Sequence, residues 1–156
     1  MDFPLHPILV HFPIALLFVS VFFDLLSTSL SRESFREGAL WLLGLGLTGG
    51  IAAAIAGRRA EDAAEKAGIA ESLIETHETW AHITLVIMAV LLLTRLLLRN
   101  RFSTRTFAGY LAIATVGLLT LIATGHTGGN LVYKHGAGVT TAPQAAQPIA
   151  QSLHGG

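Results

Sequence analysis

The sequence predicts an all-α membrane protein, an up-down bundle of four transmembrane helices. Hydrophobic residues make up 52% of the 156 residues and charged residues only 13%, whereas about 25% of a soluble domain is charged. The apolar residues also gather in four blocks, at 8–26, 39–57, 80–98 and 107–125. Each block is about as long as a helix that crosses roughly 30 Å of hydrocarbon. We therefore expect one transmembrane domain over residues 1–139.

The composition excludes several classes of function. The chain contains no cysteine, which excludes disulfides, iron–sulfur clusters, thiol catalysis and covalent attachment of a c-type haem. Its formal net charge is zero, so no general attraction to nucleic acid is expected. A hydrolase is the least expected class, because the sequence has neither an HExxH motif nor a serine elbow.

The first block begins in "HPILVHFPIALL" and contains the one acidic residue inside a span, Asp24. The N-terminus lacks the basic start of a secretory signal, so we expect this block to be retained as a helix. A carboxyl group within a membrane span needs a partner. Arg95, near the corresponding end of the third block, is a candidate for that partner.

The second block is rich in small residues, "GLGLTGGIAAAIAGRR". Gly49 and Gly50 have two alternative readings: ordinary small-residue packing between helices, or a slot in which a flat macrocycle lies against the backbone. Arg58 and Arg59 end the block, where they would pair with the carboxylates of a haem or anchor the helix among lipid headgroups. The Ala- and Glu-rich segment 58–78 is expected to be a helical connector at the membrane surface.

The fourth block is followed by "TGHTGGNLVYKHGAGV". Its glycines predict that the helix stops near Gly125. Segment 131–133 is then a short re-entrant or interfacial segment, either a lid that carries His135 to a site or an anchor through Tyr133. Residues 140–156 are rich in Ala, Gln and Pro and are expected to form a flexible tail.

Basic residues predict the orientation of the bundle. In an up-down topology, the side that carries the two termini has four of them and the opposite side has six. The four are Arg58, Arg59, Lys66 and Lys134; the six are Arg32, Arg36, Arg95, Arg99, Arg101 and Arg105. Because the basic side faces the cytoplasm, both termini are expected outside, on the periplasmic face of a bacterial inner membrane.

Histidines gather on the predicted outer side. Six of the seven fall there, namely His6, His11, His77, His82, His126 and His135. A spacing of five residues separates each of the first two pairs and rotates one member about 140° from the other on a helix, so a shared site takes one member of each pair. His11 and His82 lie deeper in their spans and are the candidate metal or haem ligands, because imidazole serves both roles. Hydrogen bonding to a backbone carbonyl is the alternative for any one of them.

The motifs "HPILVHFPIALL" and "GGNLVYKHGAGV" resemble those of a bacterial family of small four-helix membrane proteins, domain of unknown function 2231. The resemblance covers residues 4 to about 140. Its motif positions here are His6, Pro7, His11, Pro13, Gly128, Gly129, Tyr133, His135, Gly136 and Gly138. His82 matches a further family histidine. Similar proteins are sometimes joined to cytochrome c or Rieske-type domains, which implies a redox setting.

Three functions from different classes remain open. The leading hypothesis is a b-type cytochrome in which His11 and His82 ligate haem iron, and electrons pass from quinol to a protein partner on the outer side. His6, His126 and His135 would assist or serve a second haem. The second is a zinc or copper site in a small transporter or assembly factor. The third is a scaffold subunit of a larger complex without a cofactor. A stand-alone enzyme is less expected than an electron-transfer or binding subunit.

Overall fold

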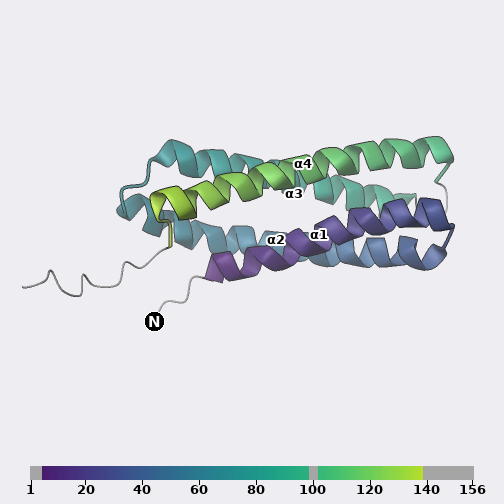
Figure 1. Ribbon diagram of the computed structural model, residues 1–156, viewed down its shortest axis with the longest axis horizontal. Helices are drawn as coiled ribbons and strands as arrows, with labels where there is room; N and C mark the ends of the chain where they lie inside the picture. Colours follow the sequence, from purple (N-terminus) through teal and green to yellow (C-terminus); the bar gives the residue numbers. More distant parts are fainter. Residues whose placement is uncertain (1–4, 99–101, 139–156) are drawn as a thin grey trace, which may run out of the picture.

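The computed structural model describes residues 5–98 and 102–138 and consists of helices in this range (Figure 1). In chain order they are α1 (Leu5–Leu30), α2 (Glu33–Lys66), α3 (Glu71–Leu97) and α4 (Thr104–His135). Each of the four contains a stretch long and apolar enough to cross a membrane. The predicted architecture, an all-α membrane bundle, is confirmed. The predicted tail lies outside the described residues.

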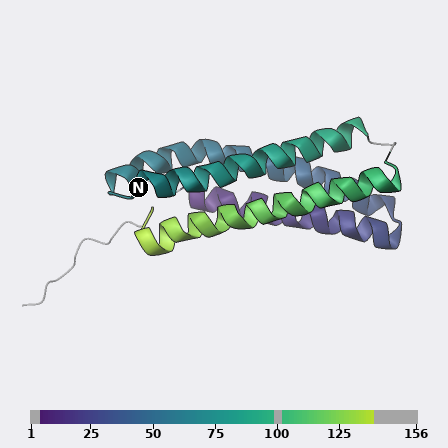
Figure 2. The same ribbon diagram turned by 90° about the horizontal axis from the view of Figure 1, so that it is seen from above.

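The bundle consists of two antiparallel hairpins that lie side by side, as Figures 1 and 2 show. Helix α1 packs mainly against α2, and α3 against α4, while the contacts of α2 with α3 and of α1 with α4 are sparser. No backbone contact joins α1 to α3 within the described part of the chain, so these two helices stand on a diagonal. We call the end at which α1 begins and α4 ends the histidine end, and the opposite end the arginine end.

Three of the helices extend beyond α1 at the histidine end (Figure 1). Helix α2 has 34 residues, about 51 Å of helix, which exceeds the roughly 30 Å of a hydrocarbon core. It continues through Arg58 to Lys66 because Ala, Glu and Lys favour helix strongly. Arg58 and Arg59 were expected to end this helix, and that expectation is wrong. The connector is helical, as predicted, but as continuations of α2 and α3 joined by a short turn.

Helix α4 likewise continues where the sequence predicted a break. It runs unbroken from Thr104 to His135, so the segment expected to fold back forms the last turns of the helix instead. Each glycine costs about 1 kcal/mol in a helix, and tertiary contacts offset that cost. Gly128 packs against a side chain of α3, and Leu131 is buried among residues of α2 and α3.

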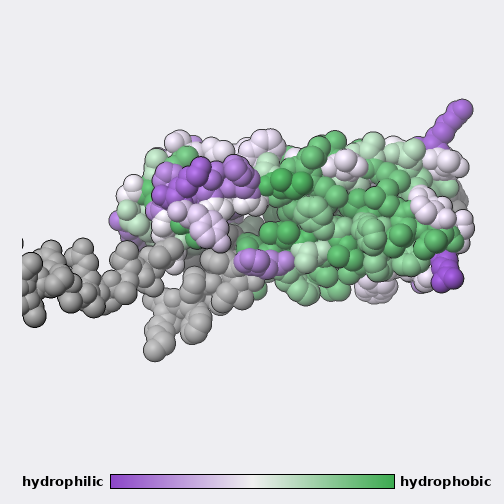
Figure 3. All heavy atoms as spheres, in the orientation of Figure 1, coloured by the Kyte–Doolittle hydropathy of each residue, from purple (hydrophilic) through white to green (hydrophobic). Residues whose placement is uncertain are grey.

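The main core runs along the middle of the bundle. Its most completely buried members include Leu17, Leu43, Met88 and Leu91. Many large apolar side chains nevertheless face outward, among them Phe12 and Val86. Figure 3 shows a broad hydrophobic band on the face in view, with polar residues toward both ends. A band of this extent is the surface of a protein whose solvent is lipid.

A smaller apolar cluster stabilises the extension at the histidine end. Ala64, Ile69, Ile74 and Leu131 are buried in it, and Ala137 packs against them. Gly136 ends α4 in the left-handed region at φ 72°, and the Ala137 N–H donates to the Leu131 carbonyl over 2.9 Å. The Gly136 N–H donates to the Val132 carbonyl over 3.0 Å, which is the αL type of helix cap, and Ala137 adds the apolar contact. Gly136, a motif residue, therefore closes the helix.

Candidate histidine site

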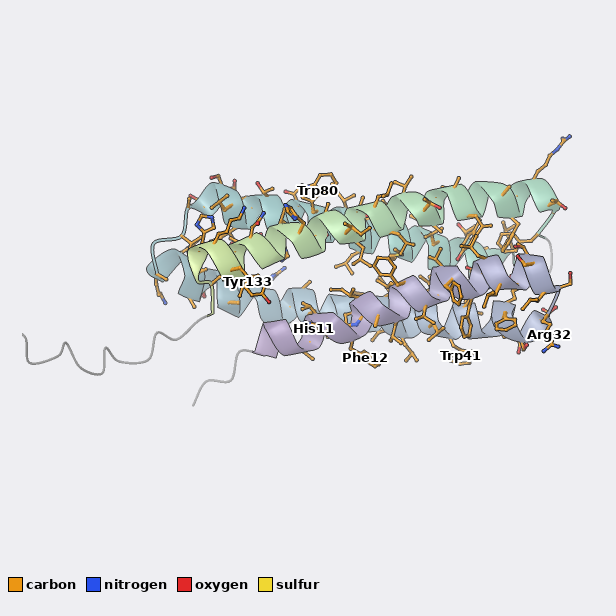
Figure 4. All side chains as sticks on the ribbon, in the orientation of Figure 1. His11, Phe12, Arg32, Trp41, Trp80 and Tyr133 are labelled. Atoms are coloured by element: carbon orange, nitrogen blue, oxygen red, sulfur yellow. The ribbon has the colours of Figure 1, made fainter. Side chains whose placement is uncertain are left out.

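His11 and His82 lie at matching depth on the two diagonal helices. A Cβ atom on Gly50 would lie 2.9 Å from Leu85 Cδ2 and 4.0 Å from Pro13 Cβ, so Pro13 and Leu85 stand at one level of the bundle. His11 precedes Pro13 by two residues, about 3 Å of helix rise, and His82 precedes Leu85 by three residues, about 4.5 Å. The two histidines therefore differ in depth by about 1.5 Å. Both side chains are exposed, and Figure 4 shows His11 in the first turns of α1.

The glycine face of α2 is covered by side chains of the neighbouring helices. A Cβ on Gly49 would lie 3.4 Å from Pro13 Cβ, and one on Gly46 would lie 2.9 Å from Leu17. Together with the approach of Leu85 to Gly50, these distances describe close small-residue packing. The helices approach one another closely because α2 has no bulk there.

His77 is the histidine that the fold holds most firmly among those whose side chains are described. Its Nδ1 lies 3.1 Å from the Thr124 carbonyl oxygen and 3.2 Å from Thr127 Oγ1. Because a carbonyl oxygen only accepts, Nδ1 carries the proton, and the lone pair of the neutral ring is on Nε2. A Cβ on Gly128 would lie 2.9 Å from His77 Cε1. The ring therefore fits against α4 only because residue 128 is glycine.

His77 was not among the ligands expected from the sequence, because His82 lies deeper in the same span. The available signal was the pair Thr124 and Thr127 followed by Gly128, which offers a carbonyl, a hydroxyl and a gap on one helix face. That pattern becomes informative only once α3 is known to face this side of α4.

The register of α3 against α4 puts His135 well beyond the level of His11 and His82, whereas it puts His126 close to the level of His82. Thr84 Oγ1 and Thr124 Oγ1 lie 3.2 Å apart and set the register of α3 against α4. His135 follows Thr124 by 11 residues, so it lies roughly 13 Å farther out than His82. The exposed His126 ring accepts from Asn130 Nδ2, over 3.2 Å to its Nε2.

The structure describes the side chains of only some of the remaining candidate residues. Arg58 is exposed on α2, about two turns outward from Gly50, and the side chains of Arg59 and His6 are outside the described part. Among the described residues, no three His, Asp or Glu side chains converge as a metal site would require. A zinc or copper centre needs three or four such ligands, whereas axial ligation of haem iron needs two.

The arginine end contains a buried ion pair. Arg95 Nη1 donates to Asp24 Oδ1, and both side chains are almost completely buried. Arg95 Nη2 donates to the Arg36 carbonyl oxygen over 2.5 Å, and its guanidinium stands 5.3 Å from the Tyr110 ring centre. The pairing of Asp24 with Arg95 considered from the sequence is confirmed.

Comparison with known families agrees with this architecture. The family model described as a predicted membrane protein, DUF2231, matches residues 2–141. The chain belongs to this family. No curated protein and no solved structure matches the chain. Several of the family-motif residues named above have described contacts at the histidine end, among them Pro13 against Gly49, Gly128 against His77, and Gly136 at the cap of α4.

Proposed function

We propose that this member of the family is a membrane electron-transfer subunit that holds one haem b between α1 and α3, with His11 and His82 as the axial ligands. The observation that carries the proposal is the matching depth of these two histidines on helices whose backbones are not in contact. An axial pair requires one imidazole from each side of a flat group. Diagonal helices provide two sides, whereas neighbouring helices in close contact do not.

The residues present fit such a group in donor type and placement. Both imidazoles are exposed, so they lie at the surface of the bundle rather than in its main core. Pro13 and Leu85 lie about 3 Å and about 4.5 Å deeper than the two histidines and would form the apolar floor that separates the group from the main core. Arg58 is the described cation toward which haem carboxylates would face. Gly49 and Gly50 allow the neighbouring helices to pack closely against α2 and do not form a preformed slot.

When bound, the haem would supply a one-electron redox centre. The role of the protein is to hold both imidazoles neutral and in a fixed orientation. A ligating histidine is oriented by the hydrogen bond of its other ring nitrogen. Position near one end of the bundle suits exchange with a protein partner at that membrane surface, and with quinol in the bilayer.

An absorption spectrum tests the proposal directly. The protein is expressed with haem supplied, purified in detergent, and measured as a reduced-minus-oxidised difference. We expect the sharp, split bands of a low-spin bis-histidine haem, and their loss in His11→Ala and in His82→Ala. His126→Ala and His135→Ala are matched controls, because both residues are exposed at the same end, and they should retain the bands.

Two results would overturn the assignment. A colourless wild-type protein rules out the haem, and metal analysis of the same sample then distinguishes a zinc or copper site from a scaffold subunit. Retention of the bands in His82→Ala together with their loss in His77→Ala would transfer the ligand to His77, whose Nδ1 is already bonded to a carbonyl as in many ligating histidines.

A further inference from the structure

Two adjoining cavities lie at the arginine end, away from the histidine site. The first, the polar cavity, has about 360 Å³ and lies between the α1–α2 turn and the start of α4. Besides Arg32 and Arg36, it is lined by the hydroxyl side chains of Ser27, Thr28, Ser31, Ser103 and Thr104. The second, the apolar cavity, has about 620 Å³ and is bounded by residues of α2 and α3. Arg36, Glu33 and Phe102 line both.

The polarity of the two cavities follows the polarity of a membrane leaflet. The polar cavity is at the helix ends, while Leu40, Leu92 and Leu96 line the apolar cavity farther along the helices. Trp41 also lines it and is 73% exposed, as is typical of aromatic residues at the headgroup level. Gly44 is at the deep end, and a Cβ there would meet nothing within 4 Å. An occupant with a polar head and an apolar chain fits this order.

Arg36 is the cation placed between the two cavities. Its guanidinium carbon is 5.2 Å from the centre of the Phe107 ring, which holds the side chain in position. Within the described residues the one ion pair is that of Asp24 with Arg95, so Arg95 is neutralised directly, whereas Arg36 makes no ion pair at contact distance with a described carboxylate. The first turn of α4 borders the polar cavity and contains no acidic residue, so its dipole adds positive potential there.

Acidic side chains are also present at the cavities. Glu33 lines both and Glu37 lines the apolar one. Counted with Arg32 and Arg36, and with Arg95 neutralised by Asp24, the lining has two positive and two negative groups. A purely anionic headgroup would face two unpaired carboxylates, whereas a headgroup with a phosphate and a hydrogen-bonding ammonium matches both signs.

We propose that the two cavities bind one phospholipid of the phosphatidylethanolamine class. Its phosphate lies in the polar cavity at Arg32 and Arg36, its ammonium faces Glu33 and Glu37, and an acyl chain follows the apolar cavity toward Gly44. The site is at the opposite end of the bundle from the histidines, so it stands independently of the haem proposal.

Native mass spectrometry of the purified, detergent-solubilised chain, with lipid added in turn, tests this site. Phosphatidylethanolamine should be retained more strongly than phosphatidylglycerol or phosphatidylcholine of the same acyl chains. Arg36→Gln should weaken retention of all three lipids at least tenfold, while Arg105→Gln, an exposed arginine at the same end, should leave it unchanged. The double change Glu33→Gln and Glu37→Gln should abolish the preference for ethanolamine over choline.

A pair of glycine variants separates the acyl-chain contact from folding. Gly44→Leu would fill the deep end of the apolar cavity, whereas Gly109→Leu adds the same bulk on α4 where a Cβ also meets nothing within 4 Å. The first should lose the lipid and the second should keep it, with equal helicity by circular dichroism. Stronger retention of phosphatidylglycerol would overturn the ammonium assignment, and inorganic phosphate that displaces the lipid fully at equal concentration would reduce the site to a free-anion site. Retention by Gly44→Leu would overturn the acyl-chain assignment.

Discussion

Removal of one partner of the Asp24–Arg95 pair should destabilise the bundle far more than removal of both. The Asp24 side chain is 0% exposed and that of Arg95 is 4% exposed. Arg95→Met leaves the Asp24 carboxylate buried without its cation, and breaking a buried pair in this way costs about 3–5 kcal/mol. Asp24→Asn is milder, about 1.5–3 kcal/mol, because Arg95 keeps the Arg36 carbonyl and an amide oxygen still accepts from it.

The double variant, Asp24→Leu with Arg95→Met, leaves no charge at the site and keeps most of the buried volume. Well-packed apolar replacements of buried pairs are often neutral or stabilising. We therefore expect its free energy of unfolding within about 1 kcal/mol of the wild type, with a compensating coupling between the two positions. Arg105→Met, at an exposed position of α4, is the control and should change stability by less than about 0.5 kcal/mol.

The assay is reversible unfolding in mixed micelles, with increasing sodium dodecyl sulfate and helicity followed by circular dichroism. The reasoning is refuted if Arg95→Met costs less than about 1 kcal/mol, the scale of an exposed pair. It is also refuted if the double variant is as unstable as the sum of Asp24→Leu and Arg95→Met, each measured as a single change, because the charges would then contribute through separate contacts.

Three further outcomes follow from the contacts. Single cysteines at Ser34 and Ser103, both exposed at the arginine end, should resist an impermeant thiol reagent in intact cells, while one at Ser72 should react; the opposite pattern would reverse the expected orientation. Gly50→Ala should cost about 1–3 kcal/mol of stability, because its Cβ would approach Leu85 to 2.9 Å. The Cβ of Gly44→Ala would meet no atom within 4 Å, so this variant should be neutral or slightly stabilising. Equal unfolding midpoints for the two variants would contradict the described packing. Gly136→Ala should lose about 1 kcal/mol by strain at φ 72°, and Gly125→Ala, within α4 and in open space, should not; thermal unfolding of the two variants decides.

The fold was predictable because the bilayer imposes it. Any apolar block of about 20 residues must satisfy its backbone internally, and a helix is the simplest solution. Short connections then make neighbouring helices antiparallel, which is enough to put α1 and α3 on a diagonal and Asp24 near Arg95. These deductions need only the positions of residues along the chain.

The helix ends and the role of His77 were not predictable in the same way. Gly125, Gly128 and Gly129 are poor helix formers, and the expected break at them follows from propensity alone. The contact of Gly128 with His77 and the burial of Leu131 outweigh that preference, and both depend on the register of α3 against α4. The same register decides that His135 lies far from His82, although the two are on the same end of the bundle.

The buried ion pair has a consequence for how the chain enters the membrane. Asp24 and Arg95 are 71 residues apart in the sequence, so the ribosome delivers the carboxyl group long before its cation. The first hairpin is therefore inserted before Asp24 has its cation. Because Asp24 lies toward the arginine end, the cost is smaller than that of an acidic residue at the middle of the bilayer, about 2.5–3.5 kcal/mol. The high mean hydropathy of that span, 2.2, offsets this insertion cost. Arrival of α3 then relieves the cost, so that Asp24 gains its cation only when the second hairpin docks against the first.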